Sequence, residues 1–182
     1  MRVIAGRFGG RRLAAPKGRA TTRPTSDRVR EAIFSMLGDL GEDARVLDLF
    51  AGTGALGIEA LSRGAARAVF VERNGAALAA LRANLRALGL GEEQAEVRRG
   101  EALVALRSAR AGAETYDLVL IDPPYRRAGE MGGELSPALA PLLSEQARVV
   151  VESDRRAPLE LPWEIEKERR YGDTTITIHR HV

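Results

Sequence analysis

From residue 45 onward, short apolar runs alternate with longer stretches in which apolar residues recur every three or four positions. The first pattern is typical of buried strands and the second of amphipathic helices. We expect strands near residues 45–50, 68–72, 95–98, 117–122 and 147–152, and helices near 55–63, 74–88, 101–109 and 136–144. Regular alternation of strand and helix predicts an α/β fold, with a mostly parallel sheet covered by helices on both faces.

The chain ends in a different pattern. Residues 163–170 and 174–180 are joined by Tyr171-Gly172-Asp173, and the second stretch is rich in β-branched residues, so the two predict an antiparallel hairpin. Ahead of the first strand, a further helix is expected to begin with Thr25 or Ser26 as its N-cap. The N-terminus of that helix, flanked by Arg23, could hold a carboxylate or a phosphate. A plain structural cap is an equally good interpretation.

The first residues of the chain predict a short hairpin studded with arginine. Residues 2–6 and 11–14 are its strands, and Gly9-Gly10 lies between them. Because a two-stranded ribbon alone is marginally stable, we expect it to dock on the rest of the protein or to become ordered on its ligand. The chain is therefore divided into a basic β-hairpin arm, residues 1–23, and one main domain, residues 24–182.

The apolar run from Leu118 to Ile121 ends abruptly at Asp122-Pro123-Pro124-Tyr125. Neither proline can donate a backbone hydrogen bond and both fix φ, so the chain must leave the sheet as a stiff loop. In open α/β sheets, ligands bind at the carboxyl ends of the strands. We therefore interpret this stretch as a functional site rather than as a strand end capped by Asp122.

A glycine-rich loop follows the first strand. Gly52, Gly54 and Gly57 have the G-x-G-x-x-G spacing, and Glu72 ends the next strand twenty residues after Gly52, where it could bind ribose hydroxyls. Dinucleotides and S-adenosylmethionine share this fingerprint. Three features favour S-adenosylmethionine: Asp48 could accept from a cationic amino group, no further domain remains to hold a hydride acceptor, and the stretch from Asp122 suits methyl transfer to an amine.

The chemistry of an exocyclic amine explains this last feature. The lone pair of such an amine is delocalised into the base, which makes it a poor nucleophile. A carboxylate oxygen of Asp122 and the carbonyl of Pro123 could each accept one N–H and orient the lone pair, while Tyr125 stacks on the base. Positioning can contribute roughly 7–11 kcal/mol, against about 10²–10⁴-fold for general-base help. Orientation should therefore dominate.

Charge is unevenly distributed along the chain. Residues 1–30 contain nine Lys or Arg residues and one acid, Asp27, which gives this stretch a net charge of +8 in a chain whose total is +3. Such an arm indicates a polyanionic partner. A solvated basic tail is the alternative.

The composition excludes several kinds of chemistry. The chain has no cysteine and only two histidines, His179 and His181. Disulfides, thiolate metal sites and a cysteine nucleophile are therefore excluded, and we assign no metal site. Methylation at C5 of a pyrimidine commonly needs a thiolate, whereas methylation of an amino nitrogen does not. No stretch approaches the ~20 apolar residues of a membrane span and no apolar signal core is evident, so we expect no membrane partner and a cytoplasmic location.

Together, several stretches resemble the RsmD family, the 16S ribosomal RNA guanine-N2 methyltransferases. They are residues 2–6, 23–31, 47–57, 59–65 and 122–125. The resemblance implies a Rossmann-like S-adenosylmethionine-dependent methyltransferase fold with a seven-stranded sheet whose last strand is antiparallel. It also implies methylation of one guanine in 16S ribosomal RNA, in the loop of helix 31, on an assembling small ribosomal subunit. A monomer is expected.

The resemblance assigns roles by position. Asp48, Gly52 and Gly54 would line the methionine end of the cofactor and Glu72 the ribose, while Glu101 stands where relatives usually have an Asp that contacts the adenine. The predicted catalytic residues are Asp122, Pro123 and Tyr125. The predicted cofactor-binding residues are Arg23, Thr25, Asp48, Phe50, Ala51, Gly52, Thr53, Gly54, Glu72, Arg73, Glu101, Ala102 and Asp122. The predicted RNA-binding residues are Arg2, Arg7, Arg11, Arg12, Lys17, Arg19 and Arg28.

Three other functions remain open at this point. A DNA adenine-N6 or cytosine-N4 methyltransferase could use the same loop after the strand, although the chain is short for sequence-specific DNA recognition. A non-catalytic RNA-binding assembly factor could retain the cofactor pocket. An NAD-dependent oxidoreductase shares the glycine fingerprint.

Overall fold

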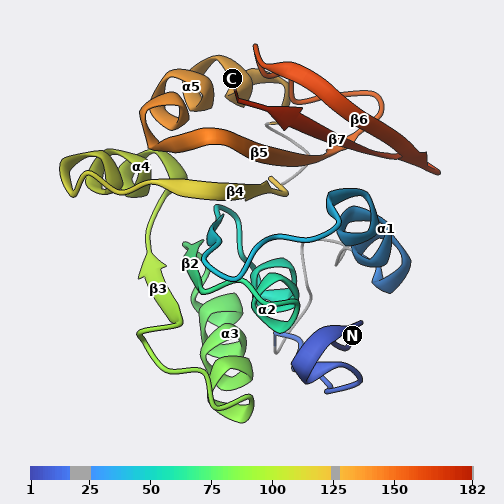
Figure 1. The fold of residues 1–182 in the computed structure, drawn as a ribbon, viewed down its shortest axis with the longest axis vertical. Coiled ribbons are helices and arrows are strands. Elements are labelled where there is room, and N and C mark those ends of the chain that lie inside the picture. The colour runs from blue at the N-terminus through green and yellow to red at the C-terminus, as the bar shows by residue number, and fades with distance from the viewer. Residues whose placement is uncertain (17–25, 124–127, 182) are drawn as a thin grey trace.

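The computed structural model describes residues 1–16, 26–123 and 128–181 (Figure 1). Its strands are β1 (Arg45–Asp48), β2 (Arg67–Glu72), β3 (Ala95–Arg99), β4 (Tyr116–Ile121), β5 (Leu143–Asp154), β6 (Glu164–Tyr171) and β7 (Thr174–Arg180). Its α-helices are α1 (Asp27–Leu37), α2 (Ala55–Ser62), α3 (Gly75–Ala87), α4 (Ala102–Ala111) and α5 (Ala128–Leu139). Two short 3₁₀ turns, η1 (Gly6–Phe8) and η2 (Ala140–Leu142), complete these elements.

All seven strands form one sheet, in the order β3-β2-β1-β4-β5-β7-β6. The pairs from β3 to β5 are parallel, and β7 runs antiparallel to both β5 and β6. The predicted mostly parallel sheet with an antiparallel last strand is therefore confirmed. The strand order reverses between β1 and β4, and this is the position where open parallel sheets leave room for a ligand at their carboxyl ends.

Helices cover both faces of the sheet. Leu118 and Leu120 of β4 lie in one apolar cluster with residues of α1, α2 and α3. Val119 and Ile121 lie in a second cluster, with residues of α4 and α5. Figure 1 shows α5 above β5 and α4 at the left end of β4, with α1 and α2 below β4. Burial on both faces explains why β4 is an unbroken apolar run rather than an alternating one.

The last predicted helix is misplaced along the chain. We expected it near residues 136–144, but α5 spans Ala128–Leu139 and β5 already begins at Leu143. Gly132 and Gly133 argue against a helix in sequence terms, yet a Cβ on Gly132 would lie only 2.1 Å from the carbonyl oxygen of Glu160. The glycine is therefore a site of close backbone packing inside the helix. Pro137, which suggests a helix start, also lies within α5.

Helix α1 is fixed at both ends by side chains. Ser26 is its N-cap and accepts from the backbone N–H of Val29 at 3.3 Å, which confirms one of the two predicted caps. At the other end, Arg148 of β5 donates to the carbonyl of Leu37 at 2.5 Å, and Lys167 of β6 donates to that of Met36 at 2.7 Å. Cations at a helix C-terminus satisfy its free carbonyls and its dipole.

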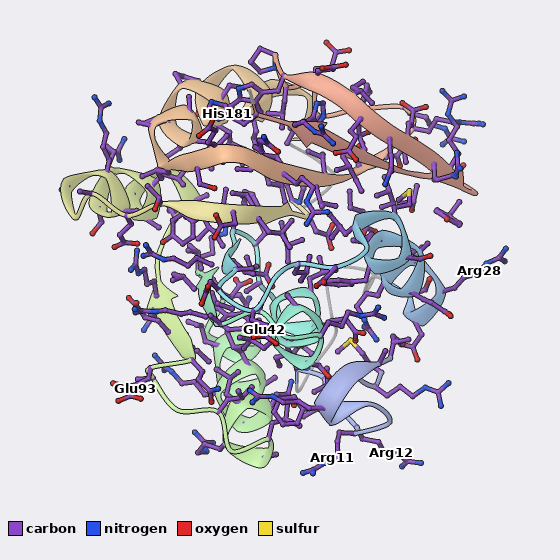
Figure 2. The ribbon with its side chains drawn as sticks, in the orientation of Figure 1. Arg11, Arg12, Arg28, Glu42, Glu93 and His181 are labelled. Carbon is purple, nitrogen blue, oxygen red and sulfur yellow. The ribbon has the colours of Figure 1, made fainter. Side chains whose placement is uncertain are left out.

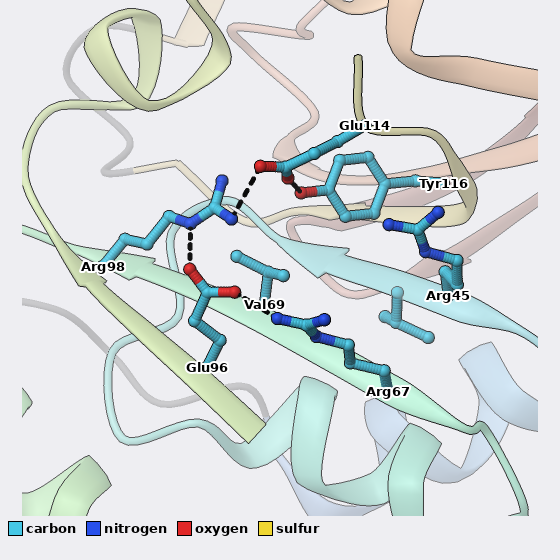
Figure 3. Close-up of a pocket in the computed structure, with 8 residues that line it drawn as sticks. Arg45, Arg67, Val69, Glu96, Arg98, Glu114 and Tyr116 are labelled. Atoms are coloured by element: carbon cyan, nitrogen blue, oxygen red, sulfur yellow. Dashed lines mark hydrogen bonds and ion pairs between the residues drawn. The ribbon is translucent and has the colours of Figure 1, made fainter. Parts of the chain in front are cut away.

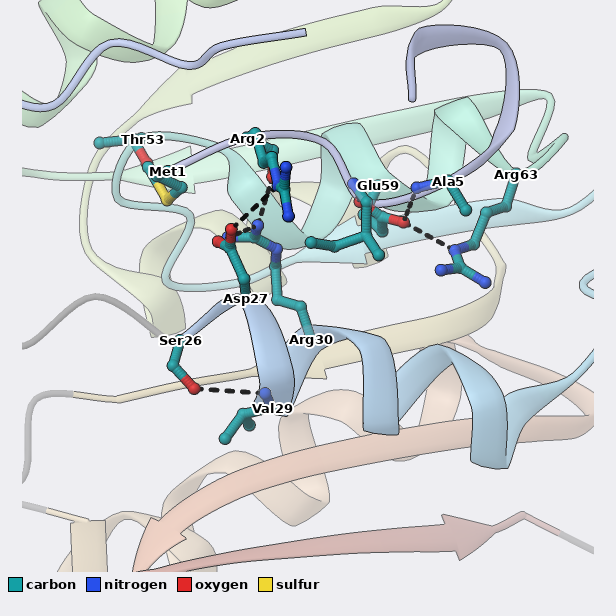
Figure 4. Close-up of polar contacts among 11 residues, drawn as sticks. Met1, Arg2, Ala5, Ser26, Asp27, Val29, Arg30, Thr53, Glu59 and Arg63 are labelled. Atoms are coloured by element: carbon teal, nitrogen blue, oxygen red, sulfur yellow. Dashed lines mark hydrogen bonds and ion pairs between the residues drawn. The ribbon is translucent and has the colours of Figure 1, made fainter. Parts of the chain in front are cut away.

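The N-terminal segment, residues 1–16, is docked on α2 and α3. The predicted hairpin is reduced to a single antiparallel bridge between Arg2 and Arg12, with η1 between them. Around this bridge, the N–H groups of Val3 and Leu13 donate to the carbonyls of Arg11 and Met1 at 2.9 and 3.2 Å. Other backbone N–H groups of the segment bind side chains of the main domain. Those of Ile4 and Ala5 donate to the buried carboxylate of Glu59 at 2.7 and 3.0 Å (Figure 4).

Two further contacts complete this docking. The N–H of Phe8 donates to Ser62 Oγ at 3.0 Å, and that of Ala14 donates to Asn84 Oδ1 at 2.7 Å. Gly6 touches α2 so closely that a Cβ there would lie 1.8 Å from the carbonyl oxygen of Ser62. The predicted boundary at residue 23 lies outside the described residues and stays a prediction.

Within the described part of the chain, no helix combines the length and the apolar character that a membrane crossing requires.

One buried group predicts how stability depends on pH. The ring of His179 is 3% exposed, its Nδ1 lies 3.0 Å from the carbonyl of Trp163, and burial lowers its pKa below the usual value. The unfolded chain therefore binds a proton that the folded chain excludes once the pH falls below about 6.5. We expect His179→Gln to lose less unfolding free energy than the wild type between pH 7.5 and 5.5, as measured by urea denaturation. Equal losses in the two proteins would contradict this.

Candidate active site

The pairing of β1 with β4 brings two of the predicted acids to one edge of the sheet. Asp48, the last residue of β1, is in register with Leu120, and the N–H of Leu49 donates to the Leu120 carbonyl at 3.0 Å. Asp122 follows β4 directly, and its charge is close enough to raise the pKa of Asp48. Pro123 is buried next to it. Tyr125 lies outside the described residues.

The glycine loop runs between β1 and α2 at this same edge. The N–H of Ala51 donates to the carbonyl of Val71 at 2.9 Å, which attaches the loop to β2. Gly52 has φ 54°, a left-handed conformation that favours glycine, and a Cβ built on it would meet no atom within 4 Å. The loop thus presents bare backbone to open space, which is the form that a ligand-binding cradle needs.

Asp48 is the acid of the site whose pKa is shifted most clearly from its ordinary value. It is 2% exposed, and its Oδ2 accepts from the N–H of Gly57 at 2.9 Å. Its pKa is raised to about 7: burial has the largest effect, the hydrogen bond from Gly57 lowers the pKa, and the negative charges of Asp122 and Glu72 raise it. A partly protonated acid with two acidic neighbours is a good place for a cation, because a positive group relieves both the burial and the repulsion.

Glu72 is held by backbone groups on both sides. Its Oε2 accepts from the N–H of Gly52 at 2.8 Å, and its Oε1 accepts from the N–H of Asn74 at 2.6 Å. A carboxylate oxygen has a second lone pair, so these contacts leave capacity for two hydroxyl donors. The carboxylate of Glu72, the predicted contact for the ribose, is therefore already oriented beside the glycine loop.

The predicted adenine end lies where β3 meets α4. The N–H of Gly100 donates to the carbonyl of Glu72 at 3.1 Å, which brings this end of β3 beside β2. Arg73 and Glu101 form an ion pair at 3.0 Å, but both side chains are more than half exposed, so the pair contributes little to stability. Ala102 is buried as the first residue of α4. Either partner of the exposed pair can turn toward a ligand at low cost.

The structure brings most of the predicted cofactor residues together. Phe50 is partly buried against the second apolar cluster and Ala51 is in the first. Thr53 lies at the other side of the loop, where Met1 Sδ is 4.0 Å from its Oγ1 (Figure 4). The predicted site residues outside the described ranges are Lys17, Arg19, Arg23, Thr25 and Tyr125. The roles of all these residues stay predictions.

The described RNA-binding candidates are exposed around the N-terminal segment. Arg11 and Arg12 project into solvent from its far end, and Arg28 projects from α1 (Figure 2). Arg11 also donates to the carbonyl of Ala87, at the end of α3, at 2.8 Å. Arg2 is 3.5 Å from Asp27, and the guanidinium of Arg7 lies 4.5 Å from the ring centre of Phe8. These exposed arginines are distributed over the N-terminal segment and α1.

The sequence-based reasoning missed three polar residues that shape the site. Asn74 caps α3, accepting from the N–H groups of Ala76 and Ala77 at 2.9 and 3.0 Å, and its own N–H orients Glu72. Glu59 and Asn84 are buried and hold the N-terminal segment. The available signal was a polar residue at an apolar position of a predicted helix, since such residues are rarely buried without a partner.

A hollow of about 130 Å³ lies at the opposite end of the sheet from the candidate site (Figure 3). It is lined by Arg45, Val46, Arg67, Val69, Glu96, Arg98, Glu114 and Tyr116. Arg98 donates to Glu96 at 2.7 Å and to Glu114 at 2.9 Å. Arg67 is also paired with Glu96. Because both acids that line the hollow are paired with arginines, we interpret it as a structural ion-pair network, separate from the candidate site.

Comparison with known proteins extends this description. The profile of the family described as conserved hypothetical protein 95 matches residues 1–180. The chain is 36% identical over 188 residues to ribosomal RNA small subunit methyltransferase D of Escherichia coli (strain K12), covering 99% of this chain and 89% of that protein. It is 38% identical over 190 residues to YlbH of Bacillus subtilis (strain 168), a candidate ribosomal RNA methyltransferase, covering 99% and 98%. The solved structure of yhhF from Escherichia coli, a candidate methyltransferase, superposes with a TM-score of 0.83 at 35% identity, covering 100% of this chain and 97% of that one.

The buried acid predicts a pH-dependent affinity for the S-adenosylmethionine that the sequence indicates. A cation bound beside Asp48 favours the ionised carboxylate, whose pKa without ligand is about 7. Affinity should therefore fall as the pH drops, by about tenfold between pH 8 and pH 6. Calorimetric titration with S-adenosylhomocysteine, which keeps the amino group, measures this. Asp48→Asn should bind more weakly at pH 8 and show no such dependence, and an unchanged pH profile in that variant would contradict the assignment.

Proposed function

Because the chain belongs to the conserved hypothetical protein 95 family, the RsmD family to which its motifs pointed, we propose that it methylates the exocyclic N2 amine of one guanine in 16S ribosomal RNA. The observation that carries the proposal is the position of Asp122 and Pro123. They follow the central strand β4 and lie beside the buried acid that ends β1. The two acceptors for the amine, Asp122 and Pro123, thus lie next to Asp48, the residue expected to bind a cation.

The residues present fit S-adenosylmethionine as the methyl donor. Asp48 offers a buried carboxylate for the amino group, Gly52 offers open backbone, and Glu72 offers oriented acceptor oxygens for the ribose hydroxyls. When bound, S-adenosylmethionine supplies an electrophilic methyl group on a sulfonium sulfur. Its two positive charges match the acids that raise the pKa of Asp48.

The chain's own contribution to the reaction is orientation. One oxygen of the Asp122 carboxylate and the carbonyl oxygen of Pro123 each accept one N–H of the guanine amine, which directs the nitrogen lone pair toward the donor. Pro123 is buried and its ring limits φ, so this pair of acceptors is stiff. As the nitrogen–carbon bond forms, the sulfur–carbon bond of the donor would break and the surplus N–H proton would pass to water, so no strong base is needed. Holding the reactants in this way can lower the barrier by roughly 7–11 kcal/mol.

The RNA lies along the exposed arginines of the N-terminal segment, whose first residue, Met1, contacts Thr53 of the glycine loop. Arginine suits this role because its planar guanidinium binds phosphates and stacks on bases. From the family resemblance, the target is the loop of helix 31, on an assembling small ribosomal subunit. The enzyme acts there as a monomer in the cytoplasm.

The nearest rival is a DNA adenine-N6 or cytosine-N4 methyltransferase. The similarity to small subunit methyltransferase D over 99% of the chain favours RNA. Nucleoside mass mapping of small-subunit RNA, from cells with and without this protein, separates the two: loss of one N2-methylguanosine supports the proposal. Methylated adenine or cytosine in DNA as the only product would overturn it.

The role of Asp122 is tested by substitution. Asp122→Ala removes one of the two acceptors, so methyl transfer from labelled S-adenosylmethionine to small-subunit particles should fall by at least about a hundredfold. Affinity for S-adenosylhomocysteine should stay within a few-fold of the wild type. Asp122→Asn, which keeps one acceptor oxygen, should retain more activity than the alanine variant. Unchanged turnover in Asp122→Ala would reject the role.

The arginine surface is tested by the salt dependence of binding. Arg11→Ala/Arg12→Ala should weaken RNA binding and reduce the slope of log K against log salt by about 0.9 or less for each phosphate that the variant no longer neutralises. Cofactor affinity should not change. Arg107→Ala/Arg110→Ala is a matched control, since these arginines are exposed on α4, on the other face of the sheet. If both double variants bind RNA equally well, the segment does not bind the RNA.

A further inference from the structure

One buried side chain joins the N-terminal segment to the glycine loop. Asn84, in the last turns of α3, is 3% exposed. Its Oδ1 accepts from the N–H of Ala14 at 2.7 Å, and its Nδ2 donates to the carbonyl of Ala14 at 3.2 Å. The same Nδ2 donates to the carbonyl of Thr53 at 3.0 Å. Both polar atoms of the amide are thus used, and they bind two different parts of the chain.

A buried amide in a helix needs a reason. Asparagine is a poor helix former, and an amide taken out of water costs free energy unless its hydrogen bonds are made. Asn84 is flanked on the buried side of α3 by Leu81 and Leu85, which are ordinary core residues. What distinguishes position 84 from theirs is contact with Ala14 and Thr53. The amide therefore serves the connection between segment and loop rather than the packing of the helix.

The N-terminal segment is otherwise tied to elements outside the loop. Glu59 and Ser62 hold it to α2. Arg30 of α1, fully buried, donates to the carbonyl of Arg2 (Figure 4). Among the described residues, direct polar links from segment to loop are Asn84 and the long Met1–Thr53 contact of 4.0 Å. Ordering of the segment can reach the loop through Asn84.

We propose that Asn84 is a positioning residue through which RNA binding on the N-terminal segment favours the cofactor-binding form of the glycine loop. The inference rests on the proposed function, because it takes RNA as the ligand of Arg2 and Arg12. RNA that holds the segment in place fixes Ala14, Ala14 fixes the amide of Asn84, and the amide fixes the carbonyl of Thr53 beside Gly52 and Gly54. By linkage, the bound cofactor must raise the affinity for RNA by the same factor.

The coupling between RNA binding and cofactor binding is measured as the ratio of two dissociation constants for the cofactor product, one without RNA and one with it. The dissociation constant for S-adenosylhomocysteine is determined by calorimetry without RNA and with saturating 16S ribosomal RNA transcript. For the wild type we expect it to fall about fivefold when RNA is present, at the lower end of typical couplings. For Asn84→Ala and Asn84→Asp the ratio should be close to one. The aspartate keeps the acceptor for the N–H of Ala14 but has no N–H for the carbonyls of Thr53 and Ala14. It therefore removes the link to the loop while keeping one hydrogen bond to the segment.

Ser62→Ala is the matched control. It removes a tie between the segment and α2 without touching the loop, so it should keep the wild-type ratio even if RNA binds more weakly. Thermal unfolding of each variant shows that the protein measured is folded. A merely structural role of Asn84 would lower the melting temperature and leave the ratio unchanged, which would overturn the proposal. A wild-type ratio of one would overturn it as well.

The proposed function fails in a different assay. Absence of methyl transfer from the wild type to small-subunit RNA or its particles would overturn the proposed function itself. Full transfer together with a coupling ratio of one would overturn only the role of Asn84.

Discussion

The parallel pairing of β1 with β4 is the constraint on which the site depends. The two strands are far apart in sequence, yet their register places Asp48 level with Leu120, two residues before Asp122. The strand order reverses at this pair of strands. The glycine loop after β1 therefore continues toward α2, and the chain after β4 leaves the sheet in a different direction. Asp48, which would bind the cation, and the Asp122-Pro123 acceptors for the amine are thereby held at one edge of a sheet that is buried on both faces. Neither part would have a fixed distance to the other without those backbone hydrogen bonds.

The site also separates charge over a short distance. The site itself is acidic, because Asp48, Glu72 and Asp122 lie near one another, whereas the N-terminal segment exposes arginines. Burial of the Asp48 carboxylate is unfavourable in the protein alone, and the N–H of Gly57 offsets only part of that cost. A bound cation relieves the remainder, so its binding stabilises the folded state as well as the loop. A polyanion is at the same time attracted to the arginines of the N-terminal segment and repelled by the three acidic residues of the site.

The sequence predicted those features that depend on local patterns. The sheet, the glycine loop and the abrupt end of β4 follow from apolar runs, glycine spacing and proline, and the fold class and the RsmD resemblance are confirmed. Helix α5 was misplaced because Gly132 is needed for contact with Glu160, a residue distant in sequence. The hairpin was overestimated for a similar reason: its pairing is limited to the bridge between Arg2 and Arg12, and beyond it Glu59 and Ser62 bind backbone N–H groups of the segment. Long-range contacts of this kind have no local signature.

The docking of the N-terminal segment has a consequence for its evolution. The segment is held by the buried side chains of Val3 and Leu13 and by its backbone amides, which bind Glu59, Ser62 and Asn84. Every residue except proline supplies such an amide. Apart from Val3 and Leu13, the path of the segment is therefore set by side chains elsewhere in the chain, and Gly6 is the position in it that cannot accept a side chain without displacing α2. The outward side chains at positions 2, 7, 11 and 12 can be exchanged while the segment keeps its place. The protein thus has a surface whose preference among nucleic acid targets can diverge without loss of the fold that carries it.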